Sequence, residues 1–115
     1  MTPAVSGAVN IGNDVLADIA GFAALECYGI VAMASPTLRD GVAQMLSQEK
    51  LRKGVRVKSD GESVTIDLFV VAEYGTNLAE VAHTMSDRVK YVVQSEAEVR
   101  VDAVNVHVQG IKVRK

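Results

Sequence analysis

Residues 55–74, VRVKSDGESVTIDLFVVAEY, carry the strongest structural signal of the chain. The dipeptide Asp60-Gly61 stands between two segments of alternating residues, and such a dipeptide is typical of the tight turn of a β-hairpin. The first segment alternates valine with basic residues, a pattern typical of a strand with one face in solvent. The second segment, 63–74, is apolar on both faces, which predicts a strand at the centre of the sheet.

Two long helices are predicted outside this hairpin. The segment 13–28 carries few charged residues, so most of its circumference is apolar. A helix of this composition is buried on several sides or forms an association surface. The segment 78–94 has one apolar stripe, and Asn77 followed by Glu80 predicts its N-terminal cap.

Shorter elements complete the chain. Residues 4–11 and 30–34 are predicted to be short strands, and a short amphipathic helix is predicted from Thr37 to Leu46. The fold class is therefore α+β: a mixed β-sheet with two main helices and one short helix, in the order β-α-β-α-β-β-α-β. We expect one domain over residues 1–115, because this length suits a single core.

The last strand, 99–113, changes phase along its length. Its valines occupy odd positions at first and even positions afterwards, and the pattern changes again after Gly110. A period of two residues changes phase only through an extra residue, so a β-bulge is expected near Asp102 or Ala103.

The composition argues against several classes of function. The net charge is −2 and aromatic residues make up 4% of the chain, so we expect no nucleic-acid partner. The basic residues within 50–58 are typical of a charged edge strand. The single cysteine, Cys27, lies in an apolar segment and is expected to be a small buried hydrophobe in a reducing compartment, hence a cytoplasmic protein. No apolar run reaches the length of a membrane span, so direct membrane insertion is not expected.

No motif for catalysis, cofactor binding or metal binding stands out. His83 has Asp87 four residues later on a helix, a spacing that allows a surface hydrogen bond. Asn105, His107 and Gln109 alternate along the last strand and are expected on one sheet face. We expect no nucleophile beside them and no carboxylate in register with them, so the face is either solvated or a partner-binding surface.

The chain resembles the alkaline-shock-protein family of bacterial envelope-stress proteins, in its short single-domain form. The resemblance covers nearly the whole sequence, and the segment 104–110, VNVHVQG, is its most specific part. The other matching segments are residues 11–24, Cys27-Tyr28-Gly29-Ile30-Val31, Asp40-Gly41, Lys53-Gly54-Val55, Ile66-Asp67-Leu68, Tyr74-Gly75, Glu80-Val81-Ala82 and Val89-Lys90.

The resemblance implies a cytosolic protein of cell-envelope homeostasis and stress, without established catalytic residues and without a cofactor. Larger members of the family are held beneath the membrane by a separate anchor protein and self-associate. Peripheral recruitment of this chain to the membrane is left open.

Two functional hypotheses follow. The first is a non-enzymatic interaction or scaffold protein that binds proteins and forms a homo-oligomer. Its expected contact residues are Asn105, His107 and Gln109 on the sheet, and Phe22 on the helix 13–28, which is expected to contribute to self-association. The alternative is an accessory or carrier protein for a lipid-like small molecule or a metabolic enzyme.

Overall fold

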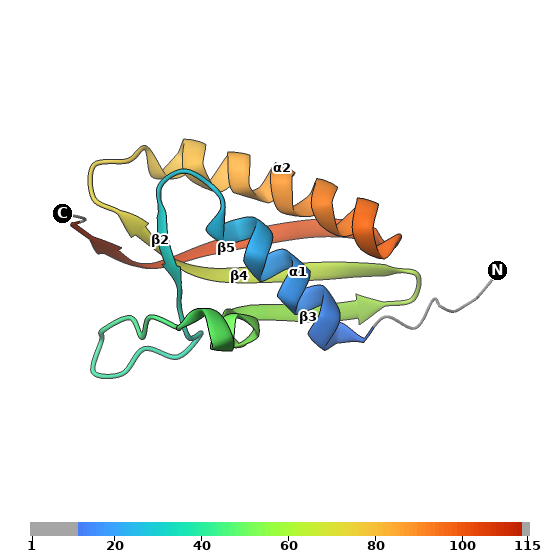
Figure 1. The fold of residues 1–115 in the computed structure, drawn as a ribbon, viewed down its shortest axis with the longest axis horizontal. Coiled ribbons are helices and arrows are strands. Elements are labelled where there is room, and N and C mark those ends of the chain that lie inside the picture. The colour runs from blue at the N-terminus through green and yellow to red at the C-terminus, as the bar shows by residue number, and fades with distance from the viewer. Residues whose placement is uncertain (1–11, 114–115) are drawn as a thin grey trace.

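The computed structural model describes residues 12–113, in which two helices cover one face of a four-stranded sheet (Figure 1). The predicted strand 4–11 lies outside the described residues. The elements are, in chain order, α1 (Asn13–Leu25), β2 (Ile30–Met33), the 3-10 helix η1 (Gln48–Gly54), β3 (Val55–Asp60), β4 (Ser63–Glu73), α2 (Leu78–Ala97) and β5 (Arg100–Lys112).

β4 is the centre of the sheet, as its sequence predicts. One of its edges pairs antiparallel with β3 along 63–68 and with β2 along 70–72. The other edge pairs with β5 in parallel over the whole length of β4. The predicted hairpin joins β3 to β4, with Gly61 at a φ of +67°, a region of backbone conformation that favours glycine. α2 connects β4 to β5, as a parallel pair requires.

The helices and the sheet enclose one hydrophobic core. Alternate residues of β4 turn toward the helices, and Ile66 and Leu68 are fully buried there. α2 contributes Met85 and Val89, both fully buried, from the predicted apolar stripe. The Asn77 side chain accepts a hydrogen bond from the Glu80 N–H at 3.1 Å, which confirms the predicted cap.

The predicted phase changes of β5 are present. The register moves from Val64 opposite Val101 to Thr65 opposite Ala103, so the extra residue is Asp102. A second shift follows Val108, where Gln109 is the extra residue. The stretch between the two bulges is regular and turns Val104 and Val106 toward the core.

The predicted helix 37–46 is wrong. Arg39 and Val42 exchange backbone hydrogen bonds across a tight turn, and the turn residues Asp40 and Gly41 have φ values of 55° and 75°. Two successive residues in the left-handed region cannot belong to a right-handed helix. The short helical segment is instead η1, which follows this turn.

Candidate functional site

A groove between α1 and α2 forms the first candidate site. Val15 and Phe22, on the outer side of α1, are 49% and 55% exposed. The groove has a volume of about 390 Å³ and is lined by Val15, Asp18, Ile19, Phe22, Ala23, Glu26, Arg88, Val92 and Glu96. Its floor is apolar and its rim is charged, an arrangement that suits the apolar side of another polypeptide.

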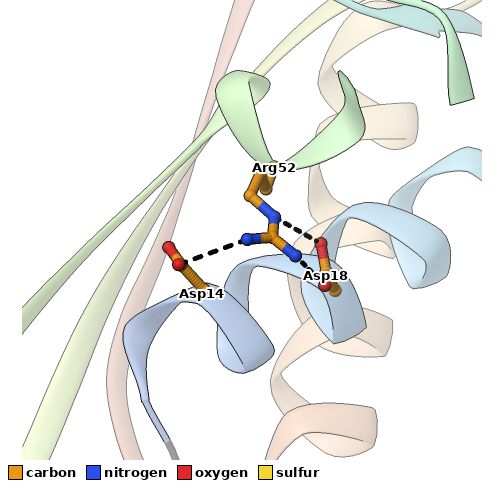
Figure 2. A network of polar contacts seen from close by, with 3 residues as sticks. All are labelled: Asp14, Asp18 and Arg52. Carbon is orange, nitrogen blue, oxygen red and sulfur yellow. Dashed lines mark hydrogen bonds and ion pairs between the residues drawn. The ribbon is translucent and has the colours of Figure 1, made fainter. Parts of the chain in front are cut away.

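Two ion-pair sets hold the rim in place. Arg52 of η1 donates two hydrogen bonds to Asp18, at 3.2 and 2.8 Å, and lies 3.2 Å from Asp14 (Figure 2). The bond to Asp18 raises the pKa of Arg52 above its usual value. Farther along the groove, Arg88 of α2 donates to Glu26, the C-cap residue of α1, at 3.0 Å. These contacts link η1 and α2 to α1 on either side of the exposed Phe22.

A polar cluster on the opposite face of the sheet forms the second candidate site. Asp67 of β4 accepts hydrogen bonds from Asn105 at 3.0 Å and from His107 Nε2 at 3.2 Å. The Asp67 side chain is 15% exposed. Burial raises the pKa of Asp67, but the hydrogen bonds from Asn105 and His107 outweigh that effect, and the pKa lies below its usual 3.8.

Phe69 lies beside this cluster, between His107 and Arg56. The His107 ring stacks on Phe69, with centroids 4.6 Å apart and an angle of 12° between the planes. The guanidinium of Arg56 lies 5.3 Å from the centroid of Phe69. With His107 and Arg56 on it, the Phe69 ring is buried, although no helix covers this face of the sheet.

Gln109 does not join the cluster. Its side-chain amide donates to the backbone carbonyls of Ser35 and Pro36, at 3.2 and 2.9 Å, and fastens the turn segment to the sheet. The structure thus brings Asn105 and His107 together, places Gln109 at the second bulge, and leaves Phe22 on the helical layer.

The expectation that no carboxylate lies in register with these residues is wrong. Asp67 is directly opposite Asn105 in the parallel pairing of β4 with β5. The sequence contains a signal for this contact, because the inward residues Ile66 and Leu68 of β4 match Val104 and Val106 of β5. Aligning these two apolar patterns side by side would have placed Asp67 beside Asn105.

Two further titratable side chains, those of His83 and Cys27, lie outside these two sites. His83 lies 3.4 Å from Asp87, as predicted for a surface pair. The Cys27 thiol donates to the Ala23 carbonyl at 3.5 Å, and burial raises its pKa. Over the same range, no three His, Cys, Asp or Glu residues are grouped so that they could hold a metal ion. None of the described helices is long and apolar enough to cross a membrane.

Comparison of the fold with solved structures gives a distant match. Two structures of the MamM-CTD, the H285A variant and the fragment 215–293, superpose with a TM-score of 0.52 at 12% and 13% identity. Each match covers 90% of this chain and 100% of the other. At this identity the likeness concerns the fold alone.

Comparison of sequences gives much closer relatives. The protein YloU of Bacillus subtilis is 44% identical over 108 residues, 93% of this chain and 90% of YloU. Spy1614 of Streptococcus pyogenes is 37% identical over 93% of this chain and 89% of its own length. A stress response regulator gls24 homolog of Streptococcus pyogenes is 27% identical over the whole chain and 64% of its own length.

The sequence model of the alkaline shock protein 23 family, described as having a cell envelope-related function, matches residues 1–113. The chain belongs to the alkaline shock protein 23 family.

Proposed function

We propose that the protein is a non-enzymatic cytoplasmic interaction protein, which serves cell-envelope homeostasis under stress by binding other proteins. The family description supports the link to the envelope, and the stress response regulator among its relatives supports the link to stress. The binding role is supported by the groove between α1 and α2.

One observation carries the proposal: Phe22 is more than half exposed beside an apolar groove. Large aromatic side chains that anchor in a partner are the residues that contribute most to protein–protein binding. The exposed Val15 lies one heptad before Phe22 on α1, and Val92 of α2 lines the same groove. The three form an apolar strip of the kind on which an amphipathic helix packs.

The charge of the rim specifies the partner further. Four carboxylates, on Asp14, Asp18, Glu26 and Glu96, lie in or beside the rim with two guanidiniums, on Arg52 and Arg88, so the rim keeps a net negative charge. A helix whose apolar stripe is flanked by lysine or arginine complements this rim, and such complementarity favours the encounter and the orientation of the partner.

Photo-crosslinking in living cells tests the proposal. A photoreactive phenylalanine analogue replaces Phe22, and in a control strain the same analogue replaces Tyr91, which is exposed on α2 outside the groove. We expect a covalent protein adduct from position 22 that the position 91 control does not form. A further change, Val15→Glu, should abolish the adduct without lowering the amount of protein, because Val15 lines the groove and is exposed. Absence of an adduct at position 22 would contradict the proposed groove.

A complementation assay connects the groove to the envelope. A strain that lacks the protein receives either the wild type or Phe22→Asp, and both are tested under cell-wall stress. We expect the variant to be as abundant as the wild type but unable to restore growth. Full restoration of growth by Phe22→Asp would show that the function does not need the groove.

The carrier hypothesis has no comparable support. A lipid-like ligand needs room between the helices and the sheet. That space holds Met33, Ile66, Leu68 and Met85, all fully buried in one continuous cluster.

A further inference from the structure

Two of the edge strands of the sheet, β3 and β5, differ in charge. In residues 12–113, β3 and β5 each pair with β4 alone, so each has a second edge without a neighbouring strand. β3 carries Arg56, Lys58 and Asp60 at alternate positions. β5 has no lysine, arginine, aspartate or glutamate from Ala103 to Ile111. Charged residues on an edge strand prevent pairing with another chain, and the β5 edge lacks this protection.

The backbone of β5 shows where its edge is free. Gln94 of α2 accepts the N–H of Val101 at 3.1 Å, and Ser86 of α2 donates to the carbonyl of Val104 at 3.1 Å. The carbonyl of Val104 therefore turns away from β4. Backbone groups of alternate residues point to the same edge of a strand, so those of Val106 and Val108 also turn away. The second bulge, at Gln109, ends this regular stretch.

We propose that the free edge of β5 pairs with the β5 edge of a second copy of this chain, antiparallel about a twofold axis at His107. Val106 of each copy then lies opposite Val108 of the other, and the N–H and C=O groups of both residues form four hydrogen bonds across the axis. The capped groups of Val101 and Val104 are not needed for this pairing. The inference goes beyond the proposed function, since it uses a different surface from the groove.

Self-pairing suits the side chains of this edge. A residue near a twofold axis lies close to its own copy, so a lysine, arginine or carboxylate there would meet a like charge. The residues around the axis, from Asn105 to Gln109, include none of these. Val108 is 36% exposed in the single chain and would be covered by the second copy. The same pairing at the β3 edge would bring together the positive charges of Arg56 and Lys58.

Hydrogen exchange of the wild type tests the inference directly. The amides of Val106 and Val108 are followed at a low and a high protein concentration. We expect both to exchange at least tenfold more slowly at the high concentration, while exposed amides of the 37–46 segment do not change. Equally fast exchange at both concentrations would overturn the inference. Equal protection at both would also overturn it, because a segment of the same chain would then cover the edge.

A pair of substitutions at one position gives an independent test. Val108→Pro removes the outward N–H and leaves the hydrogen bonds to β4 in place, a position where an edge strand tolerates proline. Val108→Thr keeps the N–H and the branched shape. In sedimentation equilibrium we expect the dissociation constant of the dimer to rise at least tenfold for Val108→Pro and to stay close to the wild type for Val108→Thr. A folded proline variant that dimerises like the wild type would refute the pairing, as would a strictly monomeric wild type.

Discussion

The two faces of the sheet are held by different interactions. On the helix side, Leu68 and its neighbours are fully buried against α1 and α2. On the other side, Asp67 is bonded to Asn105 and His107, and Phe69 is covered by a stacked ring and a guanidinium. Adjacent residues of one strand thus belong to an apolar core and to a polar cluster. We therefore expect the first face to contribute more of the stability than the second.

Removing a side chain from the helix face should have the largest effect. Leu68→Ala leaves a cavity at a fully buried position and is expected to lower the free energy of unfolding by about 2–5 kcal/mol. Urea unfolding monitored by circular dichroism measures the change. A loss below about 1 kcal/mol would show that the two faces do not differ in the way described.

Removing the acceptor from the other face should have a smaller effect. Asp67→Ala leaves Asn105 and His107 without their partner and is expected to lower the free energy of unfolding by about 1–3 kcal/mol. Asp67→Asn is the matched control, since it keeps one acceptor oxygen and should lose less. If both variants were as stable as the wild type, the cluster would contribute nothing to the fold.

The cluster should also make stability depend on pH. The pKa of Asp67 is lower in the folded protein than its usual 3.8. The stability that the ionised Asp67 carboxylate contributes is therefore fully present above pH 3.8 and is lost as the pH falls through the folded pKa. We expect the difference in unfolding free energy between the wild type and Asp67→Asn to shrink as the pH is lowered from about 6 to about 3. A difference that stays constant over this range would contradict the lowered pKa.

The smallest effect on stability is expected outside both faces. Phe22 is exposed on α1, so Phe22→Asp should change the free energy of unfolding by no more than about 0.5–1 kcal/mol. Self-association through α1, which the sequence led us to expect, would weaken in this variant, and sedimentation velocity measures it. Unfolding of the variant would instead show that Phe22 is part of the core.

Local patterns in the sequence were sufficient for most of the fold. The Asp60-Gly61 turn, the cap at Asn77 and the bulge at Asp102 depend on residues close in the sequence, and all three predictions are confirmed. The central position of β4 followed from its two apolar faces. α2 continues to Ala97, three residues beyond its predicted end.

The errors have physical causes. The apolar residues of 37–46 have helical spacing, but Asp40 and Gly41 adopt a tight turn that no periodicity reveals. The Asp67 cluster joins two strands that are far apart in the sequence, so the pattern of neither strand alone reveals the contact. The exposure of Phe22 depends on how α1 packs, which the composition of the helix leaves open between core and surface.

The pairing of β4 has a consequence for the order in which the chain folds. Only the turn at residues 61–62 separates β3 from β4, whereas residues 74–99 lie between β4 and β5. Local pairs form before distant ones, so the hairpin precedes the parallel pair. During synthesis one edge of β4 therefore remains open until residues 100–112 have left the ribosome. A strand with apolar side chains on both faces is most prone to aggregation in that interval, which makes β4 the segment that a chaperone would need to shield.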